Sequence, residues 1–202
     1  MSALYIGIYF LCWALFHSLL ASLRIKRLAG RIFGGAARRW YRLGFVITAL
    51  LTLTPLLLML LYLPDVPLYG VPPPWRWLMM AGQAASLVLL IWTIMSTEPL
   101  DFIGLKQIFA ARSPYRSALT THGLYRFSRH PMYFASMLVM WLSPRMSVNL
   151  LTLFTLMSLY FIVGSYHEEM LLVKQFGTAY QEYRKRVPRI FPGLPFPPRL
   201  GR

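Results

Sequence analysis

Residues Ser147–Tyr166 read SVNLLTLFTLMSLYFIVGSY, an apolar run that contains no charged side chain. A helix of about 20 mostly apolar residues is long enough to cross the hydrocarbon core of a bilayer. Three further runs of this kind lie earlier in the chain, namely Leu4 to Leu23, Leu43 to Leu63 and Trp75 to Met95. The sequence therefore predicts a polytopic, all-α membrane protein.

The composition agrees with lipid as the solvent. Of the 202 residues, 57% are hydrophobic and 13% are charged, whereas soluble domains carry about 25% charged residues. The length suits a single domain, which we divide into a three-helix part (1–95) and a second part (96–202). The one cysteine, Cys12, lies in an apolar run, so neither an intrachain disulfide nor a cysteine-based metal site is expected.

A fifth helix is expected immediately before the quoted run. Met132 to Leu142 is apolar but too short to span a bilayer alone. Because Ser143-Pro144-Arg145-Met146 then interrupts the apolar pattern, we expect a tight helical hairpin that turns there. The stretch from His167 through Arg186 contains no proline and predicts a long cytoplasmic helical extension, which Pro188 ends. The fold class is thus five transmembrane helices, the last two paired.

The positive charges set the expected orientation. The net charge is +15, and the basic side chains cluster in the loops that separate the apolar runs. The positive-inside bias and attraction to anionic lipid explain this clustering better than nucleic-acid binding does. The basic segments are the loop after the first run, the loop around 106–129 and the tail from 174 onward. We expect a multi-pass protein of the inner (cytoplasmic) membrane with its N-terminus outside and its C-terminus in the cytoplasm.

Two short segments carry the expected chemistry. Of six acidic residues in the chain, Glu168 and Glu169 fall where an apolar span meets the cytoplasmic extension, and ionisable groups at such a depth are functional candidates. The second segment, 121–133, combines two histidines, two arginines and two tyrosines with Gly123, and it ends in His130-Pro131 at a helix start. The alternatives are two headgroup-level carboxylates paired with arginine, and a basic interfacial loop with aromatic anchors.

These two segments resemble a known family. Gly123-Leu124-Tyr125-Arg126 with Arg129-His130-Pro131-Met132-Tyr133 is similar to the first signature of the isoprenylcysteine carboxyl methyltransferases and related phospholipid methyltransferases. Glu168-Glu169 with Phe176-Gly177, Tyr180, Tyr183 and Arg186-Val187-Pro188 resembles their C-terminal signature. Within this group the methanethiol S-methyltransferases look most similar, on stretches such as Trp141-Leu142-Ser143-Pro144-Arg145-Met146. Ala135 departs from the pattern, since the family often has glycine there.

The resemblance implies an enzyme that binds S-adenosylmethionine with residues 96–202 and needs no metal. The amino group of the cofactor is expected to bind Glu168 or Glu169. The carboxylate of the cofactor is expected to bind His130, Arg129 and the N–H groups near Pro131. The residues that this implies for cofactor binding are Gly123, Tyr125, His130, Pro131, Tyr133, Glu168, Glu169, Tyr180 and Tyr183. Arg186 and Arg129 are the candidates for activating the methyl acceptor.

Three functions remain open on the sequence. The first is methyl transfer to a small thiol such as methanethiol at the cytoplasmic face. The second is methyl transfer to a lipid or to a prenylcysteine-type carboxyl group. The third is a non-catalytic membrane scaffold of the same fold.

Overall fold

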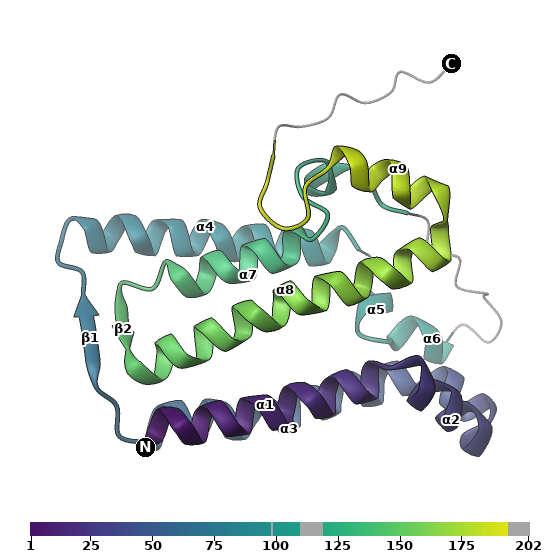
Figure 1. Cartoon of the computed structure of the whole chain (residues 1–202), viewed down its shortest axis with the longest axis horizontal. Coiled ribbons are helices and arrows are strands. Elements are labelled where there is room, and N and C mark those ends of the chain that lie inside the picture. The colour runs from purple at the N-terminus through teal and green to yellow at the C-terminus, as the bar shows by residue number, and fades with distance from the viewer. Residues whose placement is uncertain (98, 110–118, 194–202) are drawn as a thin grey trace. The chain divides into compact units, whose positions relative to one another are not determined.

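The computed structural model describes residues 1–97, 99–109 and 119–193, and these are mostly helical (Figure 1). Four of the described helices are long and apolar enough to cross a membrane. They are α1 (Ser2–Ala21), α3 (Gly35–Tyr62, with its apolar part from Arg39), α4 (Trp75–Met95) and α8 (Val148–Phe176). Helix α7 (Pro131–Trp141), the fourth of the five expected helices in chain order, is apolar but has 11 residues.

The chain forms two compact units, each built from both halves of the sequence. Within the described residues, the first unit comprises Met1–Gly70, 99–109 and Arg145–Leu156. The second comprises Val71–Thr97, 119–144 and 157–193.

In the first unit, α1 packs along α3 through side chains that satisfy each other's polar groups. The indole of Trp13 donates to the Thr52 hydroxyl at 3.1 Å, and Tyr9 donates to the Thr52 carbonyl at 2.7 Å. The short helices α2 (Leu23–Phe33), α5 (Pro99–Phe102) and α6 (Leu105–Phe109) complete this unit. Buried polar groups must find such partners, because no water is available at this depth in a bilayer.

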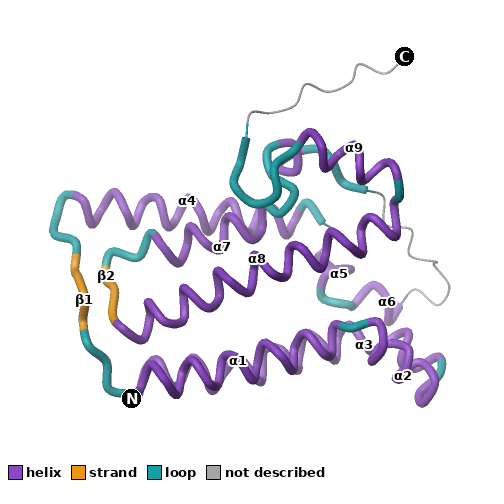
Figure 2. The backbone as a smooth tube through the Cα atoms, in the orientation of Figure 1, coloured by secondary structure: helices purple, strands orange, loops and turns teal. Residues whose placement is uncertain are grey.

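Strands β1 (Pro67–Gly70) and β2 (Arg145–Ser147) pair as a two-stranded antiparallel ribbon that was not predicted from the sequence (Figure 2, orange). The carboxylate of Asp65, next to this ribbon, accepts from the backbone N–H of Asn149 at 3.1 Å. Asn149 is the second residue of α8, so Asp65 satisfies one of the free N–H groups at that helix start.

In the second unit, α7 packs against α4 and against the later part of α8. Gln83 of α4 donates to the Val139 carbonyl at 2.8 Å, and the Trp141 indole donates to the Ser158 hydroxyl of α8 at 3.0 Å. Ser158 lies about 15 Å along α8 from its first residue, Val148, at 1.5 Å per residue. The segment between α7 and α8 therefore has to span this length. Part of it forms strand β2, where a tight turn was expected.

The expected single helix from His167 to Arg186 is interrupted at Gly177, which adopts a positive φ of 57°. Glycine reaches this conformation without the steric cost of a Cβ atom. The break allows α9 (Thr178–Arg186) to pack its apolar face against the end of α8. The resulting core contains Tyr180, Tyr183 and Val187 with Leu119, Leu172, Val173 and Phe176.

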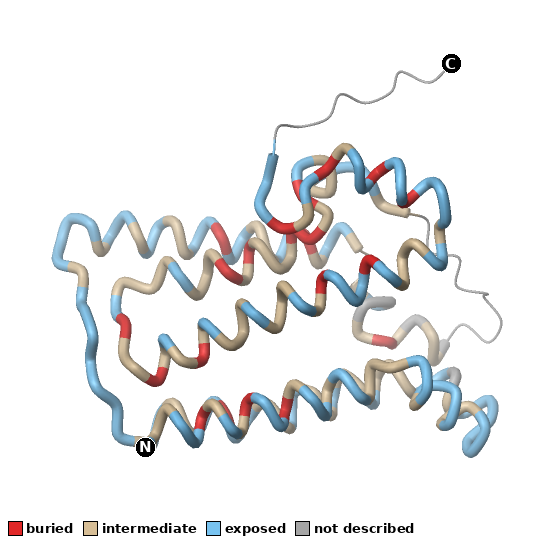
Figure 3. The backbone as a smooth tube through the Cα atoms, in the orientation of Figure 1, coloured by how far each residue is buried: buried red, intermediate tan, exposed pale blue. Residues whose placement is uncertain are grey.

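Exposed residues recur along the long helices (Figure 3, pale blue), and many of them carry large apolar side chains. Leu15 of α1 and Leu61 of α3 are 73% and 75% exposed, and Val163 of α8 is 66% exposed. Exposed apolar surface on this scale marks contact with lipid or with another protein. Together with the four long apolar helices, it identifies an integral membrane protein.

Candidate functional site

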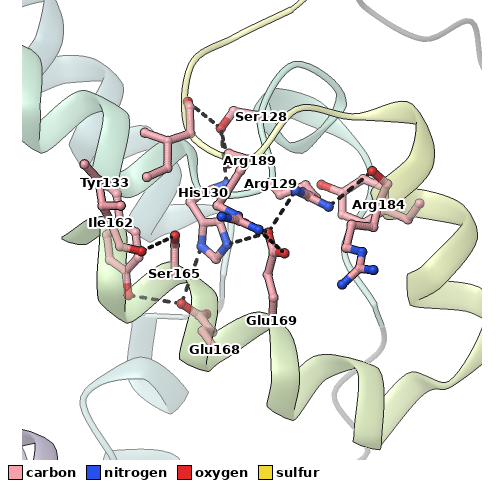
Figure 4. Close-up of polar contacts among 12 residues, drawn as sticks. Ser128, Arg129, His130, Tyr133, Ile162, Ser165, Glu168, Glu169, Arg184 and Arg189 are labelled. Atoms are coloured by element: carbon pink, nitrogen blue, oxygen red, sulfur yellow. Dashed lines mark hydrogen bonds and ion pairs between the residues drawn. The ribbon is translucent and has the colours of Figure 1, made fainter. Parts of the chain in front are cut away.

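The structure brings the two motif segments together around His130. This residue is the N-cap of α7, because Pro131 occupies the first helical position and cannot extend the helix backward. Its Nδ1 lies 3.5 Å from a carboxylate oxygen of Glu168, and its Nε2 lies 3.3 Å from one of Glu169 (Figure 4). The two ring nitrogens of His130 thus each face one of the two glutamates.

Glu169 is buried and surrounded by cations. Its side chain is 3% exposed, and one of its oxygens lies 3.1 Å from Arg129 Nη2 and 3.2 Å from Arg189 Nε. Arg189 also lies over the ring of Tyr166, with 3.4 Å between its guanidinium carbon and the ring centroid. Burial acts to lower the pKa of Arg189, but the hydrogen bond and charge of Glu169 outweigh it and raise that pKa. The hydrogen-bonding capacity of Glu169 is therefore used within the protein.

Glu168 has the opposite character. Its side chain is 49% exposed, and it accepts a hydrogen bond from the Tyr133 hydroxyl at 3.0 Å. The Tyr133 ring is itself fixed by parallel stacking on His130 and on Phe161, with centroid distances of 5.3 and 5.1 Å. Glu168 is thus an oriented carboxylate with room for an external cation.

The segment after α9 closes back onto the loop before α7. The backbone N–H groups of Arg129 and His130 donate to the carbonyls of Pro188 and Arg189, each at 2.9 Å. The buried Ser128 hydroxyl adds a bond of 2.8 Å to the Ile190 carbonyl. Both Ser128 and Arg189 belong to the site but were missed from the sequence; the position of Arg189 directly after Val187-Pro188 was an available signal.

Tyr125, Tyr180 and Tyr183 keep their hydroxyl protons at neutral pH. Burial raises the pKa of Tyr125 to about 12 and that of Tyr180 to about 12, and it raises the pKa of Tyr183 as well. The Tyr183 hydroxyl donates to the Tyr125 carbonyl at 2.7 Å. Tyr180 and Tyr183 are both buried, with an edge-to-face contact of 5.8 Å between ring centroids. Their rings pack the protein core, so cofactor binding by them stays a prediction with little exposed surface to support it.

The other predicted residues lie as follows. Gly123 has a positive φ of 61° and opens the short 3-10 turn Gly123–Arg126. The side chain of Arg129 is 7% exposed, and its guanidinium donates to the Arg184 carbonyl besides pairing with Glu169. Arg186 lies on α9, 29% exposed, with its guanidinium 4.0 Å from Glu182. The structure thus places Arg129 inside the cluster and pairs Arg186 with a neighbour on its own helix.

This arrangement can hold a zwitterionic ligand. The exposed carboxylate of Glu168 suits an ammonium group. The N-terminus of α7 has no side-chain cap, and its free N–H groups suit a carboxylate. Among the described residues, no group of three or more His, Cys, Asp or Glu side chains is arranged to hold a metal ion.

Comparison with known proteins adds independent information. The chain matches the family model described as phospholipid methyltransferase over residues 77–179. It is 28% identical over 192 residues to methanethiol S-methyltransferase 2 of Bradyrhizobium diazoefficiens, covering 90% of this chain and 70% of that protein. It is 29% identical over 160 residues to a methanethiol S-methyltransferase of a Pseudomonas species, covering 75% of this chain and 59% of that protein.

A third relative, the methanethiol S-methyltransferase of Pseudomonas deceptionensis, is 31% identical over 110 residues, which are 53% of this chain and 42% of that protein. No solved structure matches the chain. The family match covers the first motif segment and the second one as far as residue 179, so it includes His130, Glu168 and Glu169. The resemblance inferred from the sequence is confirmed, and the chain belongs to the phospholipid methyltransferase family of membrane methyltransferases.

Proposed function

We propose that this methyltransferase transfers a methyl group from S-adenosylmethionine to a small thiol such as methanethiol. The observation that carries this proposal is the pairing of His130 with both glutamates, which unites the two motif segments in one cluster. The relatives described above are all methanethiol S-methyltransferases, which supports the choice of acceptor.

The residues present fit this cofactor. Glu168 offers a half-exposed carboxylate to its ammonium group, and the uncapped start of α7 offers N–H groups to its carboxylate. When bound, S-adenosylmethionine supplies an electrophilic methyl group on a positively charged sulfur. Tyr133 holds Glu168 in place by a hydrogen bond, and Glu169 orients His130 from the buried side. These contacts preorganise the binding residues before any ligand arrives.

Activation of the acceptor falls to an arginine. The thiolate is the reactive form of a thiol, and an adjacent positive charge lowers the pKa of that thiol. Arg129 is almost fully buried against Glu169, whereas Arg186 keeps 29% of its side chain exposed. The exposure of Arg186 favours its contact with an acceptor. The burial of Arg129 against Glu169 instead favours a role in positioning Glu169.

We also propose the five-span topology, with α7 and α8 as a helical hairpin, the N-terminus outside and the C-terminus in the cytoplasm of the inner membrane. With 11 residues, α7 is about 16 Å long and cannot cross a bilayer alone. Its contacts with α4 and α8 support a paired arm that starts at His130 on the cytoplasmic side. The basic loop after α1 and the basic tail support this orientation.

A lipid acceptor is the second candidate, because the matching family is described as phospholipid methyltransferase. Exposed apolar faces along the long helices would give a lipid direct access from the bilayer. The two acceptors differ in volatility and in solubility, so one assay separates them.

The test is turnover by the full chain in lipid nanodiscs with methyl-labelled S-adenosylmethionine. Methanethiol, phospholipids and a prenylcysteine are offered separately, and dimethyl sulfide is measured in the headspace. The proposal expects labelled dimethyl sulfide from methanethiol and its loss in Glu168→Gln. Label found in lipid alone would move the assignment to the second candidate. No cofactor binding by calorimetry would leave a non-catalytic scaffold.

A further inference from the structure

Helix α2 is held where two candidate membrane spans end. It begins after Ser22, whose hydroxyl accepts from the backbone N–H of Ile25 at 3.4 Å, and it ends at Gly34, which has a positive φ of 54°. The Tyr41 hydroxyl of α3 donates to the Leu20 carbonyl of α1 at 2.6 Å and ties the two span ends together. Helix α2 connects these ends (Figure 1), so we infer that it lies where the apolar spans give way to polar surroundings.

One stripe of α2 is densely cationic. Arg24, Arg27 and Arg31 follow each other at steps of three and four residues, so their side chains share one helix face. All three are exposed, and together with Leu28 they line an open hollow. Across the described parts of the chain, no carboxylate forms an ion pair with any of these three arginines. Three neighbouring guanidinium groups repel each other unless an anion lies between them.

Apolar side chains flank this stripe. Leu28, Ile32 and Phe33 are 48%, 63% and 65% exposed. Ile25 and Ala29, on the same apolar side, are half-buried in the first unit. A cationic stripe beside an exposed apolar stripe is typical of a helix that lies in the plane of a membrane interface.

We propose that α2 is a binding site for anionic membrane lipid, with the headgroup phosphate held by Arg24, Arg27 and Arg31. Guanidinium groups bind phosphate oxygens in pairs of parallel hydrogen bonds, which suits this stripe. The acyl chains then lie along Leu28 and Ile32. A nucleic acid would use the cationic stripe but would leave the apolar side chains in water, so lipid is the occupant that matches both stripes. This site does not depend on the proposed methyl transfer.

The test measures lipid occupancy of the full chain in mild detergent by native mass spectrometry, with phosphatidylglycerol and phosphatidylcholine titrated separately. A basic residue near an anionic surface strengthens attraction roughly five-fold, so Arg27→Gln with Arg31→Gln should weaken phosphatidylglycerol binding by about 30-fold. The matched control is Lys174→Gln with Lys185→Gln, which removes two exposed charges elsewhere. We expect less than a two-fold change in the control.

Equal losses in the two double variants would overturn the proposal, because they would show a general charge effect. Equal binding of phosphatidylcholine and phosphatidylglycerol by the unmodified chain would overturn it as well. To separate a lipid from a free phosphate, water-soluble glycerol phosphate is added as competitor. The proposal expects no displacement, and it expects Ile32→Gln with Phe33→Gln to weaken lipid binding several-fold. Displacement by glycerol phosphate with no effect of the apolar variant would refute the lipid assignment.

Discussion

The adjacent carboxylates Glu168 and Glu169 give a matched pair of substitutions for which we expect different outcomes. Glu169→Gln removes the charge from a side chain that is 3% exposed and lies 3.1 to 3.3 Å from Arg129, Arg189 and His130. Removing one partner of a buried ion pair costs about 3–5 kcal/mol, because the remaining charge stays buried without compensation. Since Arg189 keeps 27% of its side chain exposed, we expect the lower end of that range.

Glu168→Gln should leave the fold almost unchanged. The Glu168 side chain is 49% exposed, and the amide oxygen of glutamine can still accept the hydrogen bond from Tyr133. A surface change of this kind alters the free energy of unfolding by no more than about 0.5 kcal/mol. The affinity for S-adenosylmethionine should fall by about ten-fold or more, since the ammonium group loses its charged partner.

Both variants are measured in the same mild detergent. Thermal unfolding is followed by tryptophan fluorescence, and cofactor affinity by isothermal titration calorimetry. At about 2–4 °C per kcal/mol for a chain of this size, Glu169→Gln should lower Tm by about 6–12 °C and Glu168→Gln should leave Tm in place. An unchanged Tm for Glu169→Gln would contradict the buried network. Unchanged affinity in Glu168→Gln would show that Glu168 is not the partner of the ammonium group.

Two further matched pairs test the packing around the site and in the first unit, by the same thermal assay. The Tyr180 hydroxyl is buried without a hydrogen-bond partner in the described residues, so Tyr180→Phe should be neutral or stabilising by about 1 kcal/mol. Tyr183→Phe should instead cost about 1 kcal/mol, because it loses the bond to the Tyr125 carbonyl; equal shifts would contradict this. Gly104 has a φ of 90°, and a Cβ atom there would lie 2.6 Å from a backbone nitrogen of α3. We expect Gly104→Ala to cost about 3 kcal/mol and Gly35→Ala, which meets no atom within 4 Å, to cost nothing measurable; a harmless Gly104→Ala would refute this close approach.

The long helices were accessible from sequence because hydropathy is a local property. A run of apolar residues needs no information about distant segments to be recognised as a candidate span. The meeting of His130 with Glu168 and Glu169 was also predicted, but there the family resemblance supplied the long-range link. The different roles of the two glutamates were not predicted, since exposure depends on which neighbours fold over each side chain.

Features that depend on distant partners escaped the sequence analysis. The β1–β2 ribbon pairs residues far apart in the chain, and its strands of four and three residues are too short to show alternation. Arg189 follows Val187-Pro188 directly, but this local position does not say that its partner is Glu169, 20 residues earlier. Gly177 was visible as an isolated glycine in a helical pattern, which is compatible with both a tolerated interior residue and a helix end. The apolar face of α9 decides between them, because it is buried only if the helix turns at Gly177.

Arg189 ties the C-terminal segment to the site in two independent ways. Its carbonyl accepts from the backbone N–H of His130, and its guanidinium pairs with Glu169, which in turn contacts the His130 ring. The backbone and the side chain of His130 are therefore both positioned by one residue that lies 59 positions later in the chain. Tyr133 stacks on His130 and orients Glu168. Displacement of Arg189 would therefore move the exposed carboxylate of Glu168 indirectly, through His130 and Tyr133. The orientation of the Glu168 carboxylate thus depends on the segment after α9 as much as on the two motif segments themselves.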